Sequence, residues 1–399
     1  MKVAIVCGDD VFAEYNKLAG DQVGEWHLQF CAALAEHGPA VTAYPRRRIE
    51  NAPEVTRRAF RTQPVSVGPT TTLPPREALP FVGEWAGELH RIWAADPPDV
   101  VHAFGWIGGL AAQLAARRLS LITVQSCHGP APAGPADDAE RSRVEPLLIR
   151  SATWMTGGST EELDALTRLR RHRSRLAILS SGVDVKRFAS TGPKSSANGM
   201  HRILQVEQNS LPRNGFDRTI QLLPKLPGAE LILVQTGGAT PEDRGEVERL
   251  AARLGVSDRV RFEDNVIPEE LPSLMRSADV VACTAREVPQ ATTALQAMAS
   301  GVVVVGVAAG ALIDTVINGV TGLLVSPTKP HELLSALKTL QSERFTRQSM
   351  GSAGRSRALS RFSWDRIALD ALTIYQQAST PELQHGRRAA GHQHSHVKI

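Results

Sequence analysis

The residues best suited to chemistry lie at the start of a predicted helix, where Ala291, Thr292 and Thr293 follow an apolar strand and an irregular loop. The first N–H groups of a helix have no partner inside the helix, and this end carries a partial positive charge, so it attracts phosphate. The two threonine hydroxyls add donors for phosphate oxygens. The arrangement predicts a phosphate-binding turn. Most helix starts bind no ligand, and that alternative stays open on these residues alone.

Short apolar runs alternate with helical stretches along the chain, which is typical of parallel sheets covered by helices on both faces. In the first half the predicted strands are residues 3–7, 40–44, 100–103, 121–125, 153–156 and 176–179. In the second half they are residues 203–206, 230–235, 260–262, 280–283, 302–307 and 322–325. The clearest predicted helices are residues 24–37, 106–118, 241–255, 271–277 and 292–300. The predicted fold class is α/β, with two Rossmann-like doubly wound domains.

A small, polar and unpatterned stretch, residues 189–200, is predicted to link the two domains. Residues 1–188 then form the N-terminal domain, and residues 201–361 form the C-terminal domain. Two such domains face each other across a cleft at the carboxyl ends of their strands, where open α/β sheets bind ligands. The predicted phosphate-binding turn would therefore open into this cleft.

Composition indicates an ordinary soluble globular protein of 399 residues, 42% hydrophobic and 22% charged, long enough for two domains. The longest apolar run, residues 301–313, is too short to span a bilayer, and the start of the chain lacks the apolar region of a secretory signal. We therefore expect a cytoplasmic protein. Residues 379–399 lack periodicity and are predicted to form a disordered tail, with a metal site at their histidines as the alternative.

Cysteines and arginines carry little functional signal. The four cysteines are scattered without a paired spacing, which predicts buried reduced thiols: Cys7, Cys31, Cys127 and Cys283. Net charge is only +4, and arginines cluster in residues 46–48 and 168–175. Such runs are usually solvated faces, with a phosphorylated acceptor or peripheral contact with an anionic membrane as the alternatives. Nucleic acid is not expected, because only 5% of residues are aromatic.

Four longer segments follow one another in an informative order. They read SSGVDVKRF, then RILQVEQNSLPRNGFD, then PEELPSLMRSADVVACTAREVPQATTALQAMASGVVVVGVAAGALIDTVINGVTGLLVSP, and finally RFSWDRIALDALTIY. In this order they resemble the retaining, nucleotide-sugar-dependent glycosyltransferases of family 4, which have the GT-B fold. The last segment resembles the helix that crosses back onto the first domain in that family. The resemblance thus implies such a helix at residues 362–378.

The resemblance implies a diphosphate site on the loop after the first strand of the second domain. The family usually grips the diphosphate there with an arginine and a lysine, but here these positions are Gln208 and Asn214, with Arg213 adjacent. A hydrogen bond to a charged group contributes roughly 1.5–3 kcal/mol, so each replacement could weaken binding about ten- to a hundredfold. Arg213 could offset one of these losses if its side chain turns into the cleft.

The family also places two glutamates, eight residues apart, against the donor sugar and the ribose. Here the second position is Gln296, whose amide still hydrogen-bonds hydroxyls, and the first is Val288. Glu287 lies one residue earlier and could reach the sugar through a bulge, with an exposed loop glutamate as the alternative. Gly310 is predicted to permit a tight turn near the donor.

In the first domain, the glycine loop that approaches the donor in this family reads Ala19, Gly20 and Asp21. The resemblance therefore implies donor contacts from Gly20 and Asp21. His128 matches the family's acceptor-side histidine, with a packed histidine as the alternative, whereas His102 is predicted to be structural. The candidate catalytic residues are thus His128 and Glu287.

The resemblance as a whole implies a retaining glycosyltransferase that needs no metal or other cofactor. It would move a hexose or related sugar from a nucleoside-diphosphate sugar to a small polar or polyhydroxylated acceptor. The altered donor positions leave an alternative from another class, a catalytically impaired protein that binds a sugar nucleotide or assists another transferase. A third alternative is a related activity with another leaving group, such as a sugar phosphate.

Overall fold

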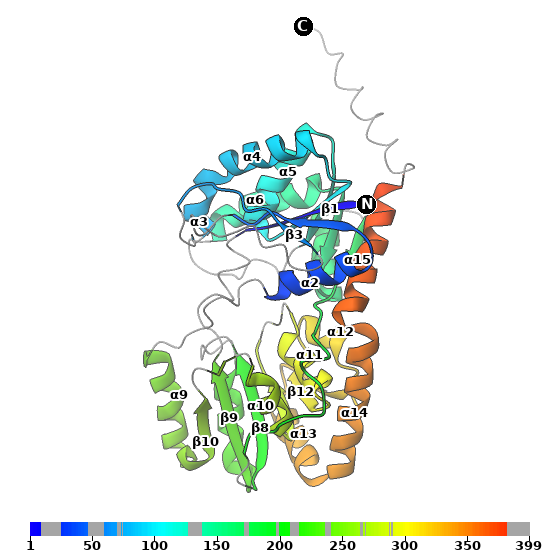
Figure 1. Cartoon of the computed structure of the whole chain (residues 1–399). Helices are drawn as coiled ribbons and strands as arrows, with labels where there is room; N and C mark the ends of the chain where they lie inside the picture. Colours follow the sequence, from blue (N-terminus) through cyan, green and yellow to red (C-terminus); the bar gives the residue numbers. More distant parts are fainter. Residues whose placement is uncertain are drawn as a thin grey trace.

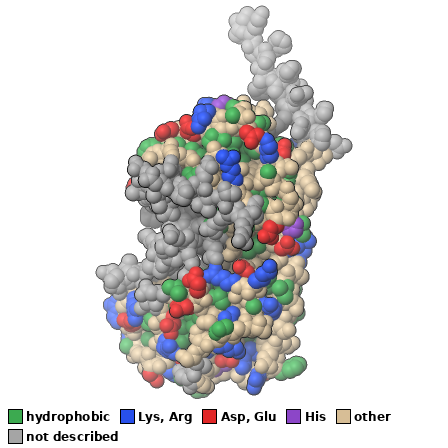
Figure 2. Space-filling view, in the orientation of Figure 1, with side chains coloured by type: hydrophobic (Ala, Val, Ile, Leu, Met, Phe, Trp, Pro, Cys, Tyr) green, Lys and Arg blue, Asp and Glu red, His purple; other side chains and the backbone are tan. Residues whose placement is uncertain are grey.

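The structure is a computed structural model that describes residues 1–8, 25–46, 60–69, 73, 75–126, 138–170, 175–196, 199–207, 215–235, 241–263, 266–267, 269–286, 288 and 290–380. These residues form two lobes, each built around one sheet (Figure 1). Acidic and basic side chains are interspersed over the visible face of both lobes (Figure 2). That mixture agrees with the slight net charge of the chain.

In the described part of the chain, the first sheet has seven strands, all parallel, in the order β3-β2-β1-β4-β5-β6-β7. Its strands are β1 (Lys2–Cys7), β2 (Ala40–Ala43), β3 (Arg61–Thr62), β4 (Val100–Phe104), β5 (Ile122–Ser126), β6 (Trp154–Gly157) and β7 (Leu176–Ile178). The strand order runs outward in both directions from β1. The sheet is therefore doubly wound, with its switch point between β1 and β4.

The second sheet repeats this plan with six described parallel strands, in the order β10-β9-β8-β11-β12-β13. Its strands are β8 (His201–Glu207), β9 (Ala229–Gln235), β10 (Val260–Glu263), β11 (Val280–Cys283), β12 (Val303–Val307) and β13 (Gly322–Val325). The switch point lies between β8 and β11. The predicted fold class, α/β with two Rossmann-like doubly wound sheets, is confirmed.

Helices cover both faces of each sheet. In the first domain they are α2 (Glu25–Glu36), α3 (Pro75–Ala78), α4 (Val82–Ala95), α5 (Trp106–Arg118), α6 (Asp138–Ser151) and α7 (Thr160–Arg170). In the second they are α8 (Phe216–Leu222), α9 (Pro241–Arg253), α10 (Leu271–Ser277), α11 (Thr292–Ala299), α12 (Ala311–Thr315), α13 (Pro330–Ser342) and α14 (Arg344–Arg361). Short 3-10 turns occur at Leu79–Phe81, Leu223–Lys225 and Ser257–Arg259. No helix in the described ranges is long and apolar enough to cross a membrane.

The last helix, α15 (Trp364–Ser379), returns to the first domain. The chain leaves α14, which packs on the second sheet, and Ser363 accepts a hydrogen bond from the N–H of Arg366 to begin the new helix. The buried face of α15 then joins the same core cluster as Phe30 of α2 (Figure 1). The predicted C-terminal crossover is therefore confirmed, and it ties the two domains together.

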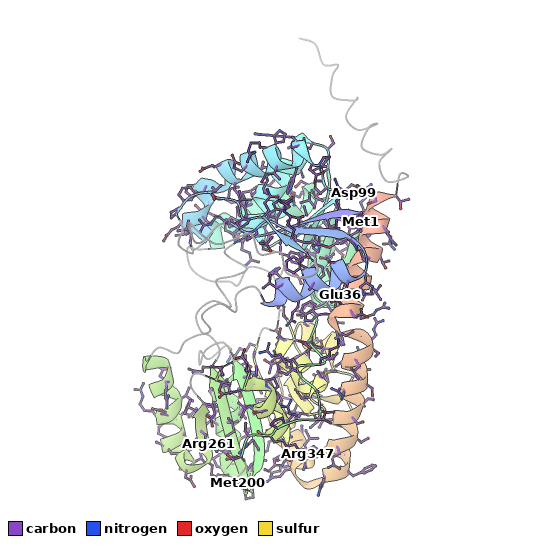
Figure 3. The ribbon with its side chains drawn as sticks, viewed as in Figure 1. Met1, Glu36, Asp99, Met200, Arg261 and Arg347 are labelled. Atoms are coloured by element: carbon purple, nitrogen blue, oxygen red, sulfur yellow. The ribbon has the colours of Figure 1, made fainter. Side chains whose placement is uncertain are left out.

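The strands of the second sheet point their carboxyl ends toward the first domain. Met200 immediately precedes β8, and Arg261 is the second residue of β10. Both lie at the lower end of the second lobe, far from the first, as does Arg347 of α14 (Figure 3). The loops after these strands are consequently the ones that meet the first domain.

Candidate functional site

A crevice between the two domains joins the loops that follow their strands. From the first domain it receives residues that follow β6 and β7, and from the second it receives the starts of α11 and α12. Its lining residues are Gly158, Leu179, Ser180, Ser181, Gln290, Ala291, Leu295, Ala311, Thr315 and Phe362. Open α/β sheets bind ligands at this edge, so the crevice is the candidate site.

The start of α11 lies at this crevice without a side-chain cap. Ala291 is the N-cap residue, and alanine has no oxygen that could accept from the first N–H groups of the helix. Thr292 Oγ1 is buried and has no hydrogen-bond partner within the described residues. A buried hydroxyl without a partner is unfavourable, which makes this oxygen a candidate ligand contact.

The two threonines of the turn differ in what they contact. Thr293 Oγ1 donates to the carbonyl of Val206 at 3.2 Å, and so ties the helix start to the carboxyl end of β8. Gln296 follows Thr292 by four residues and therefore lies on the same face of α11. Thr292 and Gln296 can thus bind the same ligand, whereas the hydroxyl of Thr293 is already used in a hydrogen bond within the protein.

The tight turn expected at Gly310 is confirmed. Gly310 has φ of +50°, and a Cβ atom added to it would lie 2.2 Å from the carbonyl oxygen of Val288. The next residue, Ala311, donates its N–H to that same oxygen at 2.8 Å. The backbone of Val288 is therefore held against the start of α12, although its side chain offers no polar group.

Two carboxylates join α7 of the first domain to α12 of the second. Asp314 accepts from both the N–H and the hydroxyl of Thr160, at 2.6 and 2.7 Å. Glu161 in turn accepts from the N–H of Gly310 at 2.9 Å. Each domain thus supplies a carboxylate to the amino end of a helix on the other. Neither acid stood out in the sequence, because nothing nearby in the chain marks a contact between domains.

Glu207, the last residue of β8, was also missed by sequence reasoning. Burial raises the pKa of its carboxyl to about 8. It lies beside buried Cys283, whose thiol pKa is raised by its own burial and then by this carboxyl. The sequence did offer a signal for Glu207: an acidic residue that directly follows a central predicted strand, one position before the candidate Gln208.

A polar network lies next to this strand end. Gln205 donates to Thr284 at 2.9 Å, and Thr284 donates to the carbonyl of Gly215 at 2.8 Å. Arg218 reaches the carbonyl of Thr284 at 3.3 Å, which holds a cation near the loop after β11. These bonds fix where that loop leaves the sheet on its way to the crevice.

His102 has the structural role that was predicted. It is fully buried, with Nδ1 2.6 Å from the hydroxyl of Tyr375 and Nε2 2.7 Å from the hydroxyl of Ser126. Its ring stacks on Phe104 at 4.2 Å. The histidine therefore links two strands to α15. Burial raises the pKa of Tyr375 well above its usual value, so its hydroxyl stays protonated in this contact.

Most of the other predicted site residues lie outside the described residues and stay predictions: Gly20, Asp21, His128, Gln208, Arg213, Asn214 and Glu287. Cys127 and the tail histidines lie outside as well. The buried thiols are confirmed where they are described, at Cys7, Cys31 and Cys283. Burial raises the pKa of Cys31 to about 12, so that thiol is unreactive.

The arginine clusters are not simply solvated faces, which corrects the prediction for two of their members. Arg46 is buried and donates to the carbonyl of Val67 at 3.0 Å. Arg170 is also buried and donates to the carbonyl of Ala152 at 3.0 Å. Both guanidinium groups therefore hold backbone carbonyls of the first domain.

Known proteins match both halves of the chain. The family described as "Glycosyl transferase 4-like domain" matches residues 26–182, and the one described as "Glycosyl transferases group 1" matches residues 193–357. A D-inositol 3-phosphate glycosyltransferase from Xylanimonas cellulosilytica is 30% identical, with 88% of this chain and 90% of that protein covered. One of the same name from Salinispora tropica is 28% identical, with 88% and 80% covered.

Solved structures share the fold. Sucrose-phosphate synthase from Thermosynechococcus elongatus superposes with a TM-score of 0.79 at 23% identity, over 94% of this chain and 98% of that one. Anabaena HepE in complex with UDP gives 0.69 at 18% identity, over 94% and 100%. With the two domain matches and the 30% identical relative, these findings show that the chain belongs to the family 4 glycosyltransferases of GT-B fold.

Proposed function

We propose that this glycosyltransferase moves a hexose or related sugar from a nucleoside-diphosphate sugar to a small polyhydroxylated acceptor, with retention at the anomeric carbon. The donor diphosphate binds over the start of α11, where Ala291 lines the interdomain crevice and Thr292 is the next residue. The sugar points toward the turn that carries Val288 and Gly310. Gln296, on the Thr292 face of the same helix, hydrogen-bonds the ribose.

The observation that carries this proposal is the buried hydroxyl of Thr292. It has no partner in the described part of the chain, and it belongs to an uncapped helix start whose N-cap residue, Ala291, lines the crevice. Uncapped N–H groups and the helix dipole favour an anion at this position. A phosphate oxygen there would satisfy both the N–H groups and the hydroxyl.

In this proposal no metal ion takes part and no dedicated base is needed. The bond between the anomeric carbon and the diphosphate oxygen breaks, and the acceptor oxygen forms its new bond on the same face. The departing diphosphate oxygen takes the proton of the acceptor hydroxyl. The α11 start stabilises the negative charge that develops on the diphosphate, as preorganised donors do. Glu287 and His128 contact the sugar and the acceptor.

Names of relatives suggest which compounds to try first. Eight curated relatives between 25% and 30% identical carry the name D-inositol 3-phosphate glycosyltransferase. HepE has been solved with UDP and with UDP-glucose. We therefore propose a uridine nucleotide as the first donor to test and a phosphorylated cyclitol as the first acceptor. The reaction needs no nucleic acid, and we place it in the cytoplasm.

Calorimetry with UDP, GDP, ADP and dTDP tests the proposal directly. We expect one of them to bind the unchanged protein, and the double substitution Gln208→Arg with Asn214→Lys to tighten that binding about tenfold or more. If none of the four binds, the proposed donor site is wrong. If one binds but the double variant does not bind it more tightly, these two residues do not contact the diphosphate.

The impaired, non-enzymatic alternative draws no support from the relatives, whose names all describe transferases. Turnover of the sugar nucleotide in the presence of acceptors separates the two functions. We expect release of the nucleoside diphosphate to depend on the acceptor, and Glu287→Gln to suppress it. Tight nucleotide binding with no turnover by any acceptor would favour the impaired alternative instead.

A further inference from the structure

Glu161 extends from the first domain to the turn where the donor sugar is proposed to lie. Its Oε2 accepts the N–H of Gly310 at 2.9 Å. The neighbouring Ala311 N–H binds the carbonyl of Val288 at 2.8 Å, and Ala311 itself lines the crevice. The successive N–H groups of Gly310 and Ala311 thus hold Glu161 and Val288 at the same turn.

The start of α7 does not need this carboxylate. Ser159 Oγ accepts from the N–H of Glu162 at 3.2 Å, and Glu162 accepts from the N–H of Gly158 at 2.7 Å. Thr160 gives its N–H to Asp314 of the other domain. The N–H groups of Thr160 and Glu162 therefore have acceptors other than Glu161, whose carboxylate contacts the second domain instead.

Glu161 also retains acceptor capacity. An ionised carboxylate offers about four lone-pair positions, and the N–H of Gly310 uses one of them. The residue is exposed, and within the described ranges its Oε1 has no hydrogen-bond partner. Hydroxyl groups of a ligand in the crevice can therefore donate to the remaining positions.

We infer that Glu161 is a donor-sugar-binding residue, whose carboxylate accepts hydroxyl hydrogen bonds from the sugar at the turn where Val288 provides none. This inference rests on the proposed function, because it requires a nucleotide sugar in the crevice. The sugar would then be recognised by a carboxylate from the first domain. Binding of the sugar would also engage both domains at once through Glu161 and Gly310.

The test compares two ligands that differ only in the sugar. Calorimetry measures the affinity of a nucleoside diphosphate and of its glucose conjugate, with UDP, GDP, ADP and dTDP each tried in turn. Glu161→Gln keeps a carbonyl oxygen for the N–H of Gly310 but removes the charge. We expect this variant to bind the conjugate about tenfold more weakly, and the bare diphosphate within about twofold of the unchanged protein.

Asp314→Asn is the matched control, because it perturbs the companion contact to Thr160 and leaves Glu161 in place. If Glu161 only holds the domains together, each variant should change the affinity for the bare diphosphate and the affinity for the glucose conjugate by the same factor. That outcome contradicts the inference. So does a result in which Glu287→Gln alters the ratio of the two affinities and Glu161→Gln does not. If the unchanged protein binds none of the ligands, the proposed function itself fails.

Discussion

Asp314 of α12 caps α7 of the opposite domain by accepting both hydrogen bonds that Thr160 can donate there. The backbone N–H lies 2.6 Å from one carboxylate oxygen, and the hydroxyl lies 2.7 Å from the other. Arg357 of α14 also holds this carboxyl end of α12 through the carbonyl of Thr315 at 2.9 Å, while Glu161 accepts the N–H of Gly310 at the amino end. The short helix α12 is therefore fixed from both ends, and it connects the first domain to the helix that leads into α15.

Replacing Asp314 with Asn should loosen this contact without unfolding the protein. The amide accepts one hydrogen bond instead of two and carries no charge, and the site is exposed, so we expect a loss of about 0.5–1 kcal/mol. Hydrogen exchange at the amide of Thr160 should speed up severalfold. Asp365→Asn, at an exposed pair with His37, should leave that amide unchanged. Equal protection in both variants would show that Asp314 does not hold α7.

Thr292→Val should separate the binding role of the hydroxyl from any role in folding. In the free protein the buried Oγ1 has no partner within the described residues, so replacing it with a methyl group should be neutral or stabilise by up to about 1 kcal/mol. Binding of the nucleoside diphosphate should nevertheless weaken about five- to tenfold. Urea unfolding and calorimetry measure the two effects.

Thr293→Val provides the comparison. Its hydroxyl donates to the carbonyl of Val206, so its loss should lower the free energy of unfolding by about 1 kcal/mol. If Thr292→Val destabilises the free protein as much as Thr293→Val does, then Thr292 is a structural residue. The diphosphate would in that case have to be held elsewhere.

These two threonines also show which features the sequence predicts and which it does not. Both hydroxyls were predicted at the helix start, and the periodicity of the apolar runs placed the helix correctly. Which hydroxyl meets β8 depends on the rotation of α11 about its axis, set by packing against distant strands. Strand β3 was not predicted, because its two residues, Arg61 and Thr62, are too few to show a pattern.

Contacts between the two domains could not be predicted from the sequence for a related reason. Glu161 and Gly310 are 149 residues apart, and neither local pattern nor composition relates them. The donor positions were predicted from the resemblance to family 4 glycosyltransferases, which rests on continuous segments of the chain. A carboxylate supplied by the other domain falls outside any such segment. Only the fold brings it to the turn that carries Val288.

Glu207 should make stability depend on pH in an unusual direction. The folded protein raises the pKa of its carboxyl from 4.5 to about 8, so the proton is held more tightly in the folded state. The contribution of this carboxyl is therefore fully present below about pH 4.5 and is lost as the pH rises toward 8. The full shift sets an upper bound of about 5 kcal/mol on this contribution.

Glu207→Gln should remove this dependence, raising the urea midpoint at pH 8.5 and leaving it nearly unchanged at pH 4.5. Glu332→Gln is the opposite case, because its hydrogen bond from the N–H of Ser326 lowers the pKa of Glu332. That variant should be no more stable than the unchanged protein at pH 8.5. A Glu207→Gln midpoint that falls at pH 8.5 would mean that the ionised carboxylate is stabilised in the fold.

Gly310→Ala should disrupt the turn that joins the donor loop to α12. The positive φ disfavours any L side chain by about 1 kcal/mol or more, and the new Cβ would lie 2.2 Å from the oxygen of Val288. The hydrogen bond from Ala311 to that oxygen must then lengthen, so we expect a loss of about 3 kcal/mol in unfolding free energy. Gly319→Ala has a φ of +76° but open space around its Cβ, and should lose only about 1 kcal/mol. Equal losses would mean that the turn yields to the added methyl group, so that close approach to Val288 is not the reason for glycine at position 310.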